Sequence, residues 1–205
     1  MIGYYDKRAQ QLDDAYRGEP PQWVREMVAD MQAALRGRRV LEVACGSGHW
    51  TCFAARSAAH VTGVDAAPRM LELARAKDCG AIFTEADAYR LDGVPGEFDA
   101  GLAMQWFSHI PRARIGEFLT GWHRRIGPGA PVFLADNQVM PYTSTYTKPG
   151  TADTFEDREL DGERFEVLKN YFTAAELRSL LDPYADDVTL HEGVHWWWLT
   201  YRVRG

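Results

Sequence analysis

Residues 38–50 read RRVLEVACGSGHW, a short apolar run followed by a glycine-rich turn. Turns of this kind hold several nucleotide-like cofactors. A dinucleotide-binding turn has the pattern GxGxxG, but Thr51 stands where the third glycine would follow Gly46 and Gly48. A phosphate-binding loop needs GxxxxGK[ST], and no lysine follows here. The turn therefore lacks a required part of both phosphate-binding patterns.

Acidic residues accompany this turn. Glu42 lies inside the apolar run, four positions before Gly46, and Asp65 and Asp87 follow two later apolar runs. A carboxylate repels a pyrophosphate but stabilises a cation, and an acid at the end of a second strand can accept hydrogen bonds from ribose hydroxyls. The pattern predicts a ligand with a sugar, a base and a positive charge, and without phosphate.

The elements that must position these residues alternate along the chain. Two helices are expected first, over residues 5–16 and 22–36, because apolar residues recur there at helical spacing. Strands are then expected at 40–45, 60–65, 81–83, 98–104 and 131–136, with helices between most of them. Alternating strands and helices predict an α/β fold with parallel strands.

The later part of the chain carries local signals. Asp161-Gly162 predicts a type I′ turn that joins strands 154–160 and 163–168. Thr173 and Glu176 form a capping box, which predicts a helix over 173–181. Two strands are expected at 187–192 and 194–204, and the tryptophan run within the second is more typical of sheet packing than of a binding site.

Four segments, VLEVACGSG, GVDAAPRML, ADA and FDAGLAMQWFSHIP, resemble in order and spacing the motifs of class I S-adenosylmethionine-dependent methyltransferases. The resemblance covers residues 40–136 and the closing strands. It implies a three-layer α/β sandwich with a Rossmann-like, seven-stranded, mostly parallel sheet, an antiparallel last strand and helices on both faces. We expect a single domain, 1–205, in which helices within 1–37 form a lid and 138–170 is inserted on the acceptor side.

The resemblance also implies roles for individual residues. Asp65 would bind the ribose hydroxyls and Asp87 the adenine amino group. Glu42 would hold the glycine turn, or the amino group of the cofactor through water. The complete set expected to bind S-adenosylmethionine is Glu42, Ala44, Gly46, Gly48, Asp65, Ala66, Asp87, Ala88, Met104 and Gln105.

Methyl transfer is an in-line displacement, so much of its rate can come from positioning alone. A base is needed only where the acceptor starts protonated. His109 and Asp136 are the expected catalytic residues, and tyrosines of the first helix are further candidates. His109 could instead cap or pack the following helix.

The acceptor is expected to be a small, partly apolar molecule that contacts Tyr5, Trp106 and Asn137. The motif of nucleic-acid amino-methylation is absent. With a net charge of −6 and no basic patch, this argues against nucleic acid. Which atom receives the methyl group stays open.

Other features limit location and alternatives. No spacing of the cysteines is typical of a metal site. The odd number of cysteines, three, and the absence of a secretory leader predict a reducing, cytoplasmic compartment. The protein is expected to be a monomer or a homodimer. No apolar run reaches the ~18 residues of a membrane span. One alternative is a non-catalytic S-adenosylmethionine-binding module that acts through a protein partner. Another is a nicotinamide oxidoreductase, which Glu42 and Thr51 disfavour.

Overall fold

The computed structural model describes residues 2–16 and 18–205. Both predicted N-terminal helices are present, as α1 (Ile2–Ala15) and α2 (Gln22–Leu35). Their positions differ. The apolar stripe of α2 packs on the main sheet, whereas Ala9 of α1 packs against Ala67 and Met70 beside α4. Only α1 is therefore placed where a lid could lie.

The main sheet has seven strands in the order β3-β2-β1-β4-β5-β10-β9. β1 pairs in parallel with both β2 and β4, and β10 pairs antiparallel with β5 and β9. The predicted fold, with an antiparallel last strand, is confirmed. The chain winds in opposite directions from β1 and β4, so a ligand crevice is expected at their carboxyl ends. The strands are β1 (Arg39–Val43), β2 (His60–Asp65), β3 (Ile82–Glu85), β4 (Ala100–Met104), β5 (Pro131–Asn137), β9 (Ala185–Glu192) and β10 (Trp196–Val203).

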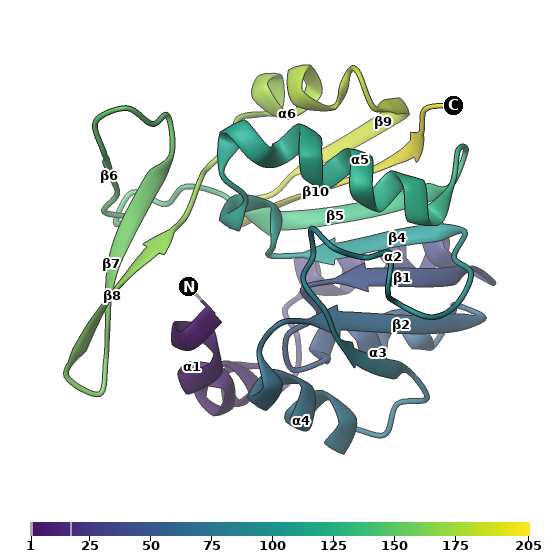
Figure 1. Ribbon diagram of the computed structural model, residues 1–205, viewed down its shortest axis with the longest axis horizontal. Helices are drawn as coiled ribbons and strands as arrows, with labels where there is room; N and C mark the ends of the chain where they lie inside the picture. Colours follow the sequence, from purple (N-terminus) through teal and green to yellow (C-terminus); the bar gives the residue numbers. More distant parts are fainter. Residues whose placement is uncertain (1, 17) are drawn as a thin grey trace.

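Helices cover both faces of this sheet (Figure 1). One buried cluster joins α2 and α3 to the sheet, and a second joins α5 and α6 to its other face. The tryptophan run of β10 alternates between them, with Trp197 in the second cluster and Trp196 and Trp198 in the first. These tryptophans are buried, as predicted for sheet packing. The remaining helices are α3 (His49–Ala55), α4 (Pro68–Ala76), α5 (Ile115–Ile126) and α6 (Ala174–Leu181), with 3-10 turns at Phe107–His109 and Arg112–Arg114.

The inserted segment forms a separate three-stranded sheet that projects beside α1 (Figure 1). β7 (Thr154–Leu160) and β8 (Glu163–Leu168) have the predicted bounds. Asp161 and Gly162 have φ of 53° and 78°, the two positive values of a type I′ turn. The short β6 (Tyr146–Thr147) lies in a stretch predicted as loop.

The helix over α6 is confirmed together with its capping box, in which Thr173 and Glu176 bond to each other's backbone. The cysteines hold a feature that the sequence reasoning missed. Cys52 of α3 and Cys79 after α4 form a disulfide, and Cys45 is a buried free thiol. Among the described residues, no helix has the length and apolar character to cross a membrane.

Candidate active site

A cavity of about 780 Å³ lies at the carboxyl ends of the parallel strands, bounded by α1 and the β7–β8 hairpin. Twelve of the fifteen predicted site residues line it. They come from six separate stretches of sequence, so the fold brings these predicted site residues together around one cavity. These twelve are Tyr5, Ala44, Gly46, Asp65, Ala66, Asp87, Ala88, Met104, Gln105, Trp106, His109 and Asn137.

Asp65 fastens the glycine turn to the end of β2. Its Oδ2 accepts a hydrogen bond from the Gly46 N–H at 2.8 Å, and its Oδ1 accepts one from the Ala67 N–H at 2.9 Å. Burial raises the pKa of Asp65, and these backbone donors oppose the rise. A carboxylate has about four lone-pair sites, so Asp65 retains capacity to accept from a ligand's hydroxyls.

Two predicted cofactor residues lie outside the cavity. Glu42 is buried below the turn; burial raises its pKa to about 8, and Thr51 opposes that rise. Gly48 has φ of 77°, and a Cβ there would lie 3.0 Å from Ala74 and 3.0 Å from Phe83. Neither residue lines the cavity, and their roles toward a cofactor stay predictions. Gly48 is needed for close packing of the turn on α4 and β3, and Glu42 lies buried near the end of β1.

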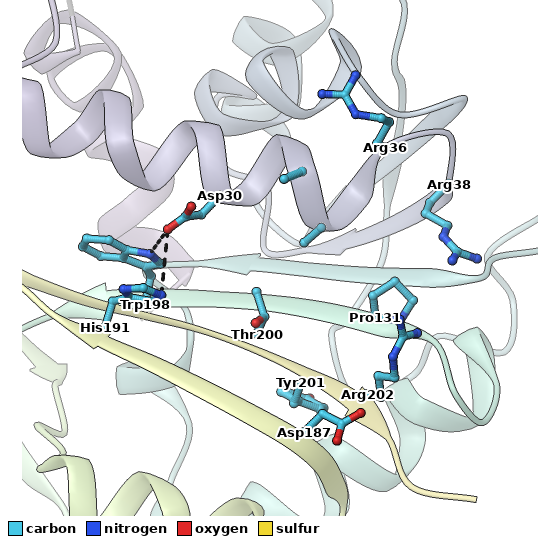
Figure 2. A pocket seen from close by; sticks show the side chains of 12 residues that line it. Asp30, Arg36, Arg38, Pro131, Asp187, His191, Trp198, Thr200, Tyr201 and Arg202 are labelled. Atoms are coloured by element: carbon cyan, nitrogen blue, oxygen red, sulfur yellow. Dashed lines mark hydrogen bonds and ion pairs between the residues drawn. The ribbon is translucent and has the colours of Figure 1, made fainter.

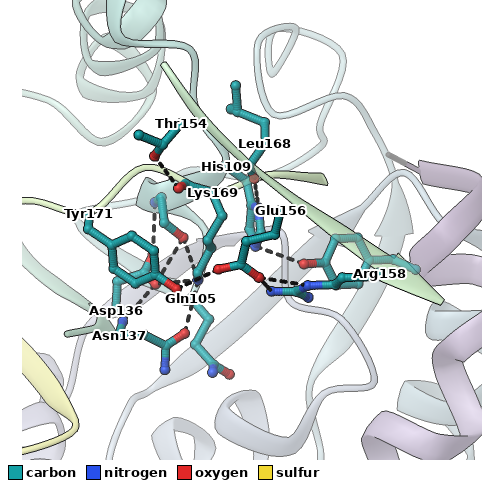
Figure 3. Close-up of polar contacts among 12 residues, drawn as sticks. Gln105, His109, Asp136, Asn137, Thr154, Glu156, Arg158, Leu168, Lys169 and Tyr171 are labelled. Carbon is teal, nitrogen blue, oxygen red and sulfur yellow. Dashed lines mark hydrogen bonds and ion pairs between the residues drawn. The ribbon is translucent and has the colours of Figure 1, made fainter. Parts of the chain in front are cut away.

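His109 lies at the other end of the cavity, where it is buried at the root of the hairpin (Figure 3). Its Nδ1 is 2.7 Å from the Leu168 carbonyl oxygen and its Nε2 is 2.9 Å from the Tyr5 hydroxyl. A carbonyl only accepts, so Nδ1 carries the ring proton and Nε2 accepts from Tyr5. Burial, aided by the charge of Lys169, lowers the pKa of His109 to about 3. The imidazole is therefore neutral.

Asp136 is held in a closed polar network rather than in the cavity. Its Oδ1 accepts from Lys169 Nζ at 3.0 Å and from the Ser108 hydroxyl at 2.9 Å. Lys169 also donates to the Asn137 side chain at 2.9 Å. Burial alone would raise the pKa of Asp136, but Lys169 and the backbone N–H groups of Ser108 and Asn137 hold it below its usual value. The Asp136 side chain is 1% exposed and does not line the cavity, and its catalytic role stays a prediction.

Comparison with known proteins supports one family. Residues 40–129 match the model of the methyltransferase domain family. The match runs from β1 to the turn after α5, so this part of the chain is similar to the methyltransferase domain family.

Two curated relatives illustrate the similarity. The chain is 32% identical over 114 residues to the ubiquinone biosynthesis O-methyltransferase of Pseudomonas aeruginosa strain UCBPP-PA14, which covers 52% of this chain and 47% of that protein. It is 37% identical over 117 residues to the protein of the same name from Xanthomonas campestris pv. campestris strain B100, covering 54% and 47%. The match thus spans about half the length of these relatives.

A solved structure extends the similarity of fold to nearly the whole chain. The DhpI–SAH complex superposes with a TM-score of 0.81 at 24% identity, over 99% of this chain and 95% of that one. At this identity the comparison establishes the methyltransferase fold alone.

The turn that follows α1 closes the end of the cavity beside the glycine turn. The Tyr16 hydroxyl bonds to Gln105, and the Tyr16 ring stacks on His49 with centroids 4.1 Å apart. Trp50 contacts Tyr16 edge-to-face and also lines the cavity, so it combines packing with a cavity position.

Sequence reasoning missed four cations of the cavity wall, which are Arg8, Arg114, Arg158 and Lys169. Only Lys169 could have been noticed in the sequence, because it directly follows the apolar end of the predicted strand 163–168, and a buried lysine is unusual. Tyr4, one of the candidate tyrosines, is buried against the hairpin and does not line the cavity.

A second hollow of about 460 Å³ lies over β9 and β10 beside α2 (Figure 2). Asp30 accepts there from Trp198 Nε1 at 2.9 Å. No predicted site residue lines this hollow. Among residues 2–16 and 18–205, no three His, Cys, Asp or Glu side chains gather closely enough to hold a metal ion.

Proposed function

We propose that the protein transfers a methyl group from S-adenosylmethionine to a small-molecule acceptor. The observation that carries this proposal is the continuity of one cavity from the Gly46–Asp65 end to the Tyr5–His109 end. Its volume of about 780 Å³ falls in the range of small-molecule sites, about 300–1,000 Å³. The curated relatives are named O-methyltransferases, which favours oxygen as the nucleophile.

The cofactor's place follows from the cavity wall. Asp65 would accept from the ribose hydroxyls, and Asp87, which is exposed after β3, would accept from the adenine amino group. Met104 and Gln105 would lie against the methionine part and the methyl group. The bound cofactor would supply the methyl group: the nucleophile attacks the methyl carbon while the bond between that carbon and the sulfur breaks.

The acceptor end holds Tyr5 rigidly. Neutral His109 accepts from the Tyr5 hydroxyl, and burial raises the pKa of Tyr5, so the phenol keeps its proton. A protonated nucleophile bound at Tyr5 can donate to its oxygen while Tyr5 donates to His109 Nε2. A base with a pKa of about 3 is weak, so we assign most of the rate to holding the nucleophile in line.

The activity is tested with the purified protein, S-adenosylmethionine and a panel of phenols, hydroxycarboxylates and amines. Mass spectrometry should detect the gain of one methyl group on an acceptor and the release of S-adenosylhomocysteine. Binding of S-adenosylhomocysteine without any methyl gain would instead support the non-catalytic binding module. Cytoplasmic location and a monomeric or homodimeric state stay predictions.

The pH profile of turnover tests the role of the histidine. Because the pKa of His109 is lowered to about 3, turnover should stay flat between about pH 5 and pH 8. An ordinary histidine would give a fall near ~6.5. A profile with such a fall would mean that His109 titrates as an exposed imidazole and contradict the buried Tyr5–His109 contact.

Removal of the phenol oxygen tests Tyr5 directly. Tyr5→Phe should lower turnover by about 10²-fold, the loss expected when a bound nucleophile is misplaced, without weakening S-adenosylhomocysteine binding. Tyr142→Phe is the control, because Tyr142 is 81% exposed and does not line the cavity. Equal turnover of both variants would remove Tyr5 from the mechanism.

A further inference from the structure

We propose that the acceptor carries a small oxyanion, a carboxylate or a phosphoryl group, which Arg8 and Arg158 hold. This inference deepens the proposed function and rests on it. Arg8 belongs to α1 and Arg158 to β7 of the inserted hairpin, and both line the cavity.

Charge is divided along the cavity. The acidic residues that line it are Asp65 and Asp87, at the ends of β2 and beyond β3, where the cofactor is expected. Arg114 also lines the cavity and interacts with Asp87. The opposite end of the wall contributes Arg8, Arg158 and Lys169, and no carboxylate of the described residues lines it there. A neutral acceptor would give no reason for this separation, whereas an anionic one is attracted to the cationic end.

Only part of that positive charge is neutralised within the described residues. Lys169 pairs with Asp136 at 3.0 Å. Arg158 donates to Glu156 through Nε at 3.0 Å and Nη2 at 2.7 Å (Figure 3). Arg8 has no carboxylate partner among the ion pairs of these residues; its hydrogen bond goes to the Tyr4 hydroxyl at 2.7 Å. Of the two arginines, only Arg158 therefore has a carboxylate partner in the described part of the chain, Glu156.

The fold brings the two guanidinium groups to the same aromatic ring. The Arg8 and Arg158 guanidinium carbons lie 5.7 Å and 5.8 Å from the centroid of Tyr4. Glu156 is further engaged, because it accepts from the Tyr171 hydroxyl at 2.6 Å. Both guanidinium groups thus border the cavity beside one ring, and an oxyanion that bonds to them would gain charge-assisted hydrogen bonds.

The anion site lies beside the expected nucleophile site. Burial raises the pKa of Tyr5, and the charge of Arg158 opposes that rise, which reflects their proximity. An acceptor anchored by its oxyanion on Arg158 would thus present a neighbouring nucleophile to Tyr5 and His109. The hairpin would select acceptors by the group that it holds, rather than by shape alone.

The test measures binding without turnover. The protein saturated with S-adenosylhomocysteine is titrated with inorganic phosphate and, separately, with lactate, by calorimetry at constant ionic strength. At least one oxyanion should bind saturably, and the stronger one identifies the phosphoryl or carboxylate source. Arg158→Gln should weaken that binding by roughly tenfold or more, the value of a lost charged hydrogen bond, and Arg158→Lys should restore part of it.

Arg164→Gln is the matched control on the same hairpin, because Arg164 is 80% exposed and does not line the cavity. Thermal unfolding of each variant checks the fold. The inference is overturned if neither oxyanion saturates the loaded protein, or if Arg158→Gln binds like the wild type. It is also overturned if Arg8→Gln and Arg158→Gln weaken S-adenosylhomocysteine binding instead, since the arginines would then hold the cofactor's carboxylate. Failure of the wild type to bind S-adenosylhomocysteine would count against the proposed function itself.

Discussion

Replacement of Lys169 by methionine should destabilise the protein strongly. The Lys169 and Asp136 side chains are 4% and 1% exposed, so Lys169→Met leaves a buried carboxylate without its counter-ion. Removal of one member of a buried ion pair costs about 3–5 kcal/mol. For a chain of this size, each kcal/mol lowers the melting temperature by about 2–4 °C, which gives a fall of about 6–20 °C.

The loss should depend on pH in a defined direction. In the wild type, Lys169 holds the pKa of Asp136 below its usual value despite burial. That stabilisation is present above the unfolded pKa of about 3.9 and is lost as the pH falls through the folded pKa. Without Lys169, burial raises the folded pKa of Asp136, so stability is lost as the pH rises through it. The difference between the two proteins should be small near about pH 4 and largest near about pH 7.

Thermal and urea unfolding across that pH range measure the effect. Lys148→Met is the matched control, because the Lys148–Glu166 pair lies on the same inserted sheet but is 43% and 41% exposed. Exposed pairs contribute about 0–1 kcal/mol. If Lys169→Met unfolds like Lys148→Met at pH 7, or if its deficit does not grow with pH, the buried network is not a charged pair and the reasoning fails.

Two further predictions concern the cofactor end. Gly48→Ala should lower the free energy of unfolding by about 1–3 kcal/mol, since the φ of Gly48 is 77° and an added Cβ would lie 3.0 Å from Ala74 and from Phe83. Gly121→Ala in α5 is the control, because an added Cβ there has no atom within 4 Å, and it should be neutral or stabilising in thermal or urea unfolding. The opposite order of stability would refute the packing argument. Asp65→Ala should weaken S-adenosylhomocysteine binding about 10–100-fold in calorimetry. Asp99→Ala should bind it normally, because Asp99 lies outside the cavity and contacts the backbone N–H and the guanidinium of Arg39. Equal affinities would mean that Asp65 does not reach the ribose.

Local sequence signals predicted the elements well. The turn of Asp161-Gly162 requires two positive φ values, which few residue pairs adopt, so the hairpin bounds were correct at both strands. The capping box at Thr173 likewise fixes the start of α6. The β6 strand of two residues has no periodicity to detect and was missed.

The site was predictable where a motif sets the backbone, as at Gly46 and Asp65. It was not predictable where residues far apart in sequence meet. Lys169 finds Asp136 across 33 positions, and Tyr5 finds His109 across 104. The resemblance to a family assigned Glu42 and Gly48 to the cofactor site, but it did not indicate that Glu42 is buried or that Gly48 packs against α4 and β3 outside the cavity.

The inserted segment has an attached end, or root, at residues 153 and 169–170, and a free end, or tip, at the turn of Asp161, and the two ends should differ in how well they tolerate replacement of their sequence. At the root, Asn170 is fully buried and bonds to the Ser108 and Ile110 carbonyls and to Asp153. At the tip, the strands meet solvent around Asp161. A graft that replaces the tip but retains residues 153 and 169–170 would therefore keep its attachment to the sheet. Acceptor preference could then diversify, in evolution or in the laboratory, by exchange of one contiguous stretch of the gene while the cofactor half stays unchanged.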